Sequence, residues 1–198
     1  MNGGAVAGPD GLLRCPWALS APEYLDYHDH EWGRPVRTVQ GLYERMTLEA
    51  FQSGLSWITI LRKRENFREA FAGFDPEQVA RFDEADVERL MGDAGIVRNR
   101  AKIEAAINNA RVVSELGEEF AELILRHQVL DRPPPTAEDW RATSPESVAM
   151  AKELKRHGIR FFGPTTAYAL MQAVGLVDDH LADCFVRAAE PPPAGPRT

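Results

Sequence analysis

Cysteine occurs only twice in this chain of 198 residues, once near each end, and each cysteine has a histidine at a spacing that suits metal ligands. His180 and Cys184 are four residues apart, so one helical turn would place both side chains on one face. Cys15 and His28 are separated by twelve residues and need a loop to close. Together these side chains could form a tetrahedral Cys2His2 site, the closed geometry of structural zinc, and tie the first ordered segment to the last. The alternative is two unrelated buried thiols and two surface histidines.

Length and composition favour one globular domain. A hydrophobic fraction of 44% is enough for a sizeable core, and 27% charged residues is ordinary for a soluble protein. No run of eighteen apolar residues is present, so we expect no membrane partner. The first residues lack the basic and apolar regions of a secretory signal. Two distant cysteines make no disulfide framework, so we expect free thiols and a cytoplasmic location.

The charge balance limits how this chain could meet nucleic acid. A net charge of −7 argues against a protein that coats nucleic acid through charge alone. It is compatible with an enzyme that has one local basic face, because residues 62–64 and 98–102 are basic runs. Each run taken alone is more often a solvated helix face than a binding patch.

Apolar residues recur with helical spacing nearly throughout, which predicts an all-α fold of about eight to ten helices in one body. The ends, residues 1–11 and 188–198, are rich in Gly, Pro and Ala and are predicted to be disordered tails around a domain of residues 12–187. The proline-rich residues 132–136 are predicted to be an extended linker, and the sequence assigns no function to segment 131–136. Caps and periodicity place helices at residues 22–27, 39–52, 58–71, 76–82, 83–91, 98–116, 118–127, 145–157 and 164–175.

A turn at residues 92–95 separates two of these helices. Gly95 lies in the turn, and Arg98 and Lys102 open the second helix, which is the pattern of a helix–hairpin–helix. Exposed backbone N–H groups at a helix N-terminus, with basic side chains nearby, suit a phosphodiester backbone without reading its bases. An ordinary turn with a glycine cap explains the same residues equally well.

Aromatic residues are dense in the first third of the chain and are interleaved with histidine and acidic residues. Core packing accounts for some of them, but such side chains also make good walls for a pocket that stacks a flat, electron-poor ring. The group is Trp17, Tyr24, Tyr27, Trp32 and Trp57.

Glu49 lies on an apolar predicted helix, between Leu48 and Phe51. A carboxylate in this position is expected to be partly buried, and it then needs a partner or has a raised pKa. It could accept a hydrogen bond from an exocyclic amine. A solvent-facing glutamate on a helix is the alternative.

These segments together resemble the 3-methyladenine DNA glycosylase I family, over about residues 12–187. Pro16 is a departure, because the family often has glycine there, and it affects only the local turn. The matching segments, in order, are Arg14–Trp17, Tyr27–Gly33, Leu48–Trp57, Asp93–Ile96, Phe162–Thr165 and Met171–His180, followed by Cys184.

The resemblance implies a helix–hairpin–helix fold that carries one structural zinc ion. Glu49 would hydrogen-bond the damaged base with Tyr27 beside it, and Trp57 and Trp17 would stack on the base. Leu55, on the turn at Gly54, would wedge into the gap left by the flipped nucleotide. The zinc ligands implied by the resemblance are Cys15, His28, His180 and Cys184.

The implied reaction is hydrolysis of the N-glycosidic bond of 3-methyladenine in double-stranded DNA, which releases the free base and starts base excision repair. Residues 103–130 contain five glutamates and no aspartate. Lys102 is a possible nucleophile, but a phosphate or solvent contact is preferred, which predicts a monofunctional glycosylase without lyase activity. The alternatives are a module that binds alkylated or distorted DNA without cleaving it, and a purely structural zinc protein. We expect a monomer.

Overall fold

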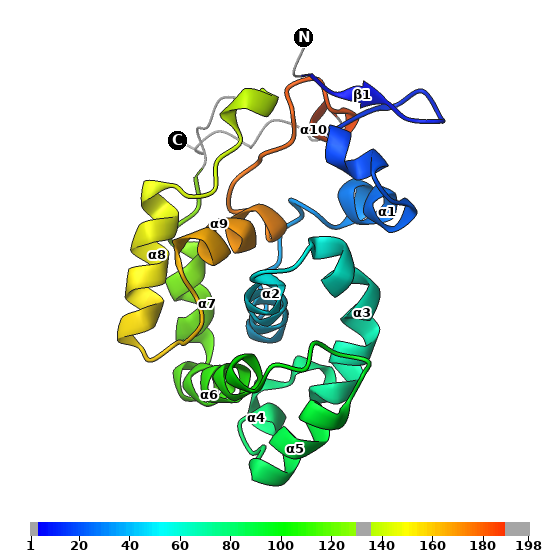
Figure 1. Ribbon diagram of the computed structural model, residues 1–198. Helices are drawn as coiled ribbons and strands as arrows, with labels where there is room; N and C mark the ends of the chain where they lie inside the picture. Colours follow the sequence, from blue (N-terminus) through cyan, green and yellow to red (C-terminus); the bar gives the residue numbers. More distant parts are fainter. Residues whose placement is uncertain (1–3, 130–135, 189–198) are drawn as a thin grey trace.

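The computed structural model of this chain describes residues 4–129 and 136–188, and helices account for most of them (Figure 1). The predicted mostly helical fold is confirmed, and no helix in the described part is long and apolar enough to cross a membrane. The α-helices are Pro22–His30 (α1), Val39–Gln52 (α2), Trp57–Ala70 (α3), Pro76–Val79 (α4), Glu84–Gly92 (α5), Arg100–Leu116 (α6), Glu118–Leu125 (α7), Pro145–Arg156 (α8), Pro164–Ala173 (α9) and Phe185–Ala188 (α10). Short 3₁₀ helices are Pro16–Leu19 (η1), Ala72–Phe74 (η2) and Ala137–Asp139 (η3).

Several helices begin where a local side chain satisfies the first free N–H groups. Thr38 accepts a hydrogen bond from the Gly41 amide at the start of α2, and Asn99 accepts one from the Lys102 amide at the start of α6. Asp83 forms a capping box at the start of α5. These signals are short-range and visible in the sequence, so the predicted starts of α2 and α6 lie close to the observed ones.

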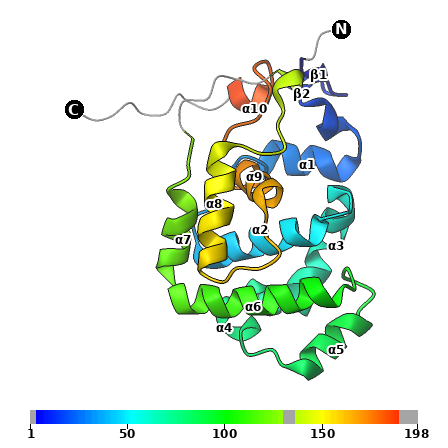
Figure 2. The same ribbon diagram turned by 60° about the vertical axis from the view of Figure 1, so that its left-hand side comes forward.

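Helix α2 lies near the middle of the helical body and packs against α3, α6, α7 and α9 (Figures 1 and 2). Leu42, Met46 and Phe51 on this helix have no exposed surface. The Phe51 ring continues the core into α3, with its centroid 4.8 Å from that of Phe67. Every residue of α2 from Met46 to Phe51 is buried, so a polar side chain in this stretch is held inside the protein.

The first and last described segments meet at one end of the molecule (Figures 1 and 2). Val6–Ala7 (β1) pairs antiparallel with Leu13–Arg14 (β2), and α10 packs against β2. The Asp183 carboxylate accepts a hydrogen bond from a backbone amide of the first segment at 2.9 Å. The Arg14 guanidinium lies over the Phe185 ring, 4.8 Å from its centroid. The two ends of the described chain are therefore in direct contact.

The short sheet differs from the predicted disordered tail over residues 1–11, because residues 4–11 are part of this hairpin. Strands of two residues carry too short a pattern to be recognised, and the glycines around them resemble a tail. Residues 1–3, the linker residues 130–135 and the predicted tail beyond residue 188 lie outside the described residues.

Candidate metal centre and aromatic pocket

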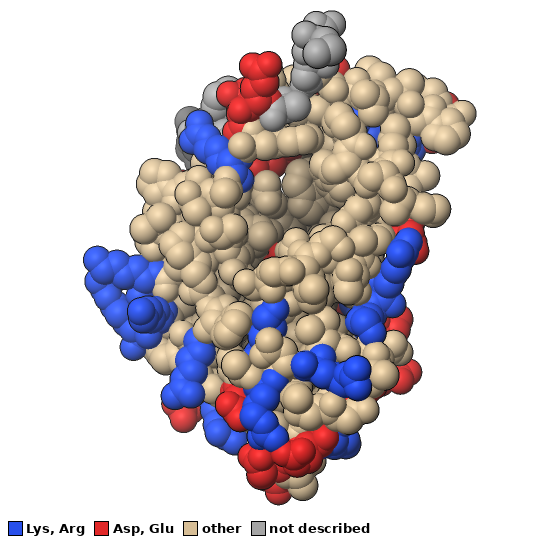
Figure 3. All heavy atoms as spheres, viewed as in Figure 1, with Lys and Arg blue, Asp and Glu red and all other residues tan. Residues whose placement is uncertain are grey.

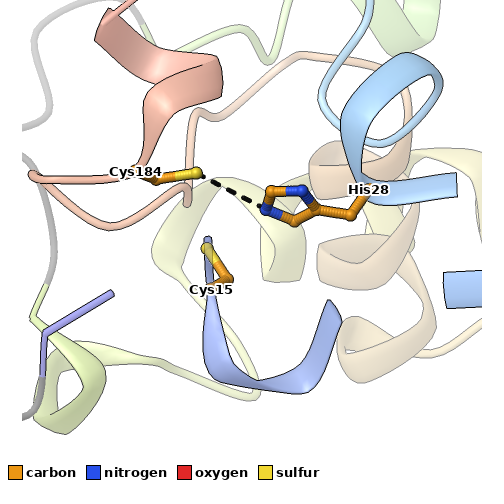
Figure 4. A group of neighbouring side chains, drawn as sticks. All are labelled: Cys15, His28 and Cys184. Carbon is orange, nitrogen blue, oxygen red and sulfur yellow. Dashed lines mark hydrogen bonds between the residues drawn. The ribbon is translucent and has the colours of Figure 1, made fainter. Parts of the chain in front are cut away.

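Two cysteines and a histidine from the two ends of the chain form a buried group (Figure 4). Cys15 lies just before η1, His28 lies in α1, and Cys184 lies just before α10. Their ligand atoms are all within 4.8 Å of one another, and the Cys184 Sγ is 3.5 Å from the His28 Nε2. The structure thus brings three of the four predicted ligands together, and they join the N- and C-terminal segments. We call Cys15, His28 and Cys184 the metal group.

His180, the fourth predicted ligand, lies beside this group and is not one of its members. Its ring centroid is 5.1 Å from that of His28, and its Nε2 is buried without a hydrogen-bond partner among the described residues. The predicted helical turn from His180 to Cys184 is wrong, because this segment is a non-helical turn before α10. The ring also presses on Gly33, where a Cβ would lie 2.7 Å from the His180 Cε1.

Carboxylates fix the orientation of both imidazole rings. The His28 Nδ1 is 2.8 Å from an Asp29 oxygen, and the His180 Nδ1 is 2.9 Å from an Asp178 oxygen. Each pair favours the proton on Nδ1 and leaves Nε2 as a free electron pair, as around metal-bound histidines. A cation bound between the sulfurs and these Nε2 atoms would give the His180 Nε2 the partner it lacks. The residues present therefore fit a metal ion.

The two thiols interact in this closed space. The contact with Cys15 lowers the pKa of the Cys184 thiol to about 4, and the neighbouring His28 adds to this effect. The same contact with Cys184, together with burial, raises the pKa of Cys15. Thiolates are the form of cysteine that binds metals, and the contact between the two sulfurs favours a state in which one of them is ionised.

A cavity of about 350 Å³ lies next to the metal group, between η1, α1, α2, α3 and α9. Figure 3 shows a hollow in this part of the surface. Side chains from segments far apart in the sequence converge on the cavity. All six residues predicted to surround a flat ring line it, namely Trp17, Tyr24, Tyr27, Trp32, Glu49 and Trp57.

Trp17 and Trp32 form a wall that the cavity shares with the metal group. Their rings meet edge to face, 5.0 Å apart between centroids. Behind them, Trp17 lies 5.2 Å from the His28 ring, and Trp32 lies 4.6 Å from the His180 ring. Any shift of the two histidines would therefore move this wall.

Tyr27 and Trp57 form a second aromatic surface, with ring centroids 5.5 Å apart. Burial raises the pKa of Tyr27, so its hydroxyl stays protonated and can donate a hydrogen bond. The Trp57 Nε1 is buried and has no hydrogen-bond partner within residues 4–129 and 136–188. This surface offers a ligand both ring faces and donors.

Glu49 projects from α2 into the cavity and is only 6% exposed. Burial raises the pKa of its carboxyl to about 8, an effect that Arg45 partly opposes. Arg45 and Arg64 are themselves bound to Glu31, at 2.9 and 2.6 Å. No hydrogen bond to the Glu49 carboxyl is found in the described part of the chain. A buried acid without a partner is costly to the fold, which makes Glu49 a candidate ligand-binding group.

Four further residues line the cavity and were not predicted as site residues. Helical spacing could have found Gln52, one turn after Glu49. Gln172 donates a hydrogen bond to the Asp179 carboxylate at 2.7 Å, and the Trp140 Nε1 donates to the Asp179 carbonyl at 3.1 Å. No local pattern points to Trp140, because it lies far in sequence from the other aromatic residues. The four are Gln52, Trp140, Ala169 and Gln172.

The predicted hairpin is present as α5, a turn and α6. The Gly95 amide donates a hydrogen bond to Asp93 at 2.7 Å, and Lys63 donates to a carbonyl of the same turn at 2.8 Å. Arg100 is bound by acidic residues of α5 and α6. Arg98 is exposed and has no ion-pair partner among the described residues, so its charge is available to a ligand.

Lys102 does not occupy the exposed position that was predicted for it. Its Nζ is buried against the end of α2 and donates hydrogen bonds to the carbonyl oxygens of Phe51, at 2.8 Å, and Ser53, at 2.6 Å. The prediction of a phosphate or solvent contact is therefore corrected, because the Lys102 ammonium group is already hydrogen-bonded to carbonyl groups of the protein. Lys102 holds the turn in which Gly54 has a φ of +82° and Leu55 is 41% exposed.

Comparison with known proteins identifies the family. A family model described as methyladenine glycosylase matches residues 17–187. The chain belongs to this family. The matched region of this methyladenine glycosylase contains the aromatic pocket, the hairpin and three of the four cysteine and histidine side chains discussed above.

Curated relatives and solved structures agree with this assignment. DNA-3-methyladenine glycosylase of Haemophilus influenzae is 44% identical over 86% of this chain and 96% of its own length. DNA-3-methyladenine glycosylase 1 of Escherichia coli is 45% identical over 87% of this chain and 96% of its own. A solved structure of 3-methyladenine DNA glycosylase I from Staphylococcus aureus, described as the basis of its 3-methyladenine recognition, is 34% identical with a TM-score of 0.82, over 90% of this chain and 98% of that one.

Proposed function

We propose that this methyladenine glycosylase removes 3-methyladenine from double-stranded DNA by hydrolysing the N-glycosidic bond, which leaves an abasic site and starts base excision repair. The observation that carries the proposal is the buried carboxyl group of Glu49, which lacks a partner among the described residues and faces an aromatic cavity. The names of the relatives from Haemophilus influenzae and Escherichia coli describe the same activity.

The pocket suits a flat, cationic base in both size and chemistry. Trp57 and Trp17 would stack on the ring, because an electron-poor ring is attracted to the negative face of an aromatic side chain. Glu49 would accept a hydrogen bond from the exocyclic amine, with Tyr27 beside it and Trp32 completing the wall. A volume of about 350 Å³ is at the small end of ligand pockets, as expected for a single base.

Bond cleavage itself would need little help from the protein. Methylation gives the base a positive charge, so it leaves with the electrons of the glycosidic bond and becomes neutral, while water adds to the sugar. Glu49 in its ionised form favours the cationic base within the pocket. Binding of that cation would therefore draw the pKa of Glu49 down from about 8 and release a proton.

The hairpin and the turn after α2 would hold the duplex. Leu55, raised on the turn at Gly54, would fill the gap left by the flipped nucleotide. Arg98 and the turn at Gly95 would contact phosphates without reading the sequence. We propose that the protein acts as a monomer.

We assign one structural zinc ion to Cys15, His28 and Cys184, with His180 as the fourth ligand. Two thiolates and two imidazoles suit the tetrahedral coordination of zinc. The ion would balance the charge of the thiolates and would supply no chemistry to base release. Its ligands would hold the wall formed by Trp17 and Trp32 in place.

Release of the free base tests the function and the role of Glu49 together. We expect the protein to liberate 3-methyladenine from methylated duplex DNA at low salt, and Glu49→Gln to be slower by roughly a hundredfold, because a neutral amide binds the cation poorly. Glu65→Gln, a change at an exposed glutamate, is the matched control. Absence of release by the folded, zinc-loaded protein would favour a module that binds alkylated DNA without cleaving it.

Lyase activity should be absent, since the Lys102 Nζ is bound to carbonyl groups and is not available as a nucleophile. Borohydride should trap no covalent adduct with DNA that contains an abasic site. A trapped adduct in the wild type that disappears in Lys102→Met would overturn the assignment of a monofunctional glycosylase.

A further inference from the structure

The loop between α8 and α9 presents a phenylalanine to solvent in a strained conformation. Phe161 is 44% exposed, whereas the adjacent Phe162 is buried at 8%. Phe161 has a φ of +57°, in the left-handed region that bulky residues rarely adopt. A large apolar side chain that is both exposed and strained marks a candidate functional position.

A buried amide holds the loop in this conformation. Asn109 on α6 is 3% exposed, and its side chain bonds both backbone groups of Arg160. The Arg160 amide donates to the Asn109 oxygen at 2.8 Å, and the Asn109 nitrogen donates to the Arg160 carbonyl at 2.9 Å. The neighbouring Asn108 donates to the carbonyl of Gly158 at 2.9 Å. The exposed position of Phe161 is therefore built by side chains of the core and is not a consequence of a loose loop.

Phe161 stands across a groove from the turn that carries Leu55. The groove has a volume of about 730 Å³ and is lined by Ser53 on one side and by the loop of Phe161 on the other. Lys102 connects the two sides, because its Nζ lies 2.6 Å from the Ser53 carbonyl and 5.8 Å from the centroid of the Phe161 ring. Two exposed apolar side chains therefore lie near this groove, because Phe161 lines it and Leu55 follows two residues after Ser53, which also lines it.

The charge of the groove suits a polyanion. Lys155 and Arg160 line it and are exposed, and no acidic residue is among the described residues that line it. An occupant must combine negative charge with apolar surface that a phenyl ring can cover. Duplex DNA offers phosphates and the faces of unstacked bases, and the groove is continuous with the Leu55 turn that the proposed function already places against the duplex.

We propose that Phe161 is a second wedge, which stacks on the base left without a partner opposite the flipped nucleotide, while Lys155 and Arg160 contact the phosphates beside it. The proposal rests on the proposed function, since a partnerless base arises only when the lesion is flipped out. Leu55 would fill the gap in the damaged strand, and Phe161 would cover the complementary strand. These two side chains together would keep the duplex open around the lesion.

Binding to a duplex with a stable abasic-site analogue opposite 2-aminopurine tests this role. We expect Phe161→Ala to bind roughly tenfold more weakly and to lose the change in 2-aminopurine fluorescence that the wild type produces. Phe161→Trp should restore both signals, because indole also stacks. Val148→Ala, at an exposed apolar residue of α8 that does not line the groove, should behave as the wild type.

Two further measurements separate this proposal from folding defects and from the proposed function. Glycine adopts positive φ freely, so Phe161→Gly should unfold at the same or a higher temperature than the wild type and still bind DNA weakly. Wild-type affinity and fluorescence in Phe161→Ala and Phe161→Gly, alongside normal 3-methyladenine release by the wild type, would overturn the wedge alone. If the wild type releases no 3-methyladenine, the proposed function fails instead.

Discussion

Two buried polar clusters share the wall formed by Trp17 and Trp32, and they differ in how their carboxylates are used. At the metal group, Asp29 is bound to His28, and beside the group Asp178 is bound to His180. In the pocket, the Glu49 carboxyl has no hydrogen-bond partner within the described residues. Carboxylates that already orient their neighbours suit a permanently held ion. A carboxylate left without a partner suits a ligand that arrives and leaves.

The largest expected effect comes from removing a ligand of the metal group. His28→Ala should lose its metal and more than about 4 kcal/mol of unfolding free energy, which lowers the melting temperature by about 10 °C or more. His30→Ala, on the same helix but with a side chain 71% exposed, should change neither the metal content nor the free energy of unfolding. Thermal unfolding together with elemental analysis of both variants makes the comparison. A His28→Ala protein with full metal content would remove His28 from the ligand set.

Removal of the Glu49 carboxyl from the pocket should have the opposite effect and raise the free energy of unfolding, because this buried group destabilises the fold. The pKa of Glu49 is about 8 in the folded protein against an ordinary value of 4.5. As pH rises above 4.5 the unfolded chain loses this proton first, so the stability of the wild type falls until about pH 8 and is then level.

Glu49→Gln has no such group, and its advantage in unfolding free energy over the wild type should grow across this range to a few kcal/mol, on the order that a shift of this size implies. Urea unfolding at pH 5 and pH 8.5 measures it, with Glu65→Gln as the control. A difference between Glu49→Gln and the wild type that is the same at both pH values would mean that Glu49 is ionised throughout.

The smallest expected effect tests the orienting carboxylates themselves. Asp178→Asn should weaken metal binding by roughly 10- to 100-fold, because His180 loses the partner that fixes its ring. Asp26→Asn alters the equivalent pair with the exposed His30 and should leave metal affinity unchanged. Competition with a chromophoric chelator provides the affinities. Equal affinities in the two variants would show that His180 is not oriented for the metal.

Features with local causes could be predicted from the sequence. Helices α2 and α6 begin at Thr38 and Asn99, whose side chains bond amides only three residues away. The pocket residues from Trp17 to Trp57 were predicted from their residue types and from the family resemblance, and the structure brings them around one cavity.

Features set by distant contacts could not be predicted. Lys102 follows a helix cap and reads as a surface lysine, yet its Nζ bonds to carbonyls from a helix about fifty residues earlier. Trp140 lines the pocket from a distant segment, where its indole N–H donates a hydrogen bond to the Asp179 carbonyl. The strain at Phe161 depends on an amide of α6, which no pattern around residue 161 contains. Exposure and backbone strain depend on the assembled core, so the local periodicity of the sequence does not predict them.

The joining of the chain ends also constrains how the protein is made. His28 and Cys184 are in contact although 156 residues separate them in the sequence. A ribosome must therefore synthesise nearly the whole chain before the metal group can close, and closing so long a loop costs conformational entropy. Until then the wall formed by Trp17 and Trp32 lacks the complete pair of histidine rings that packs behind it. A nascent or truncated chain could form the α2 core and the hairpin, but it would have no rigid pocket for a base.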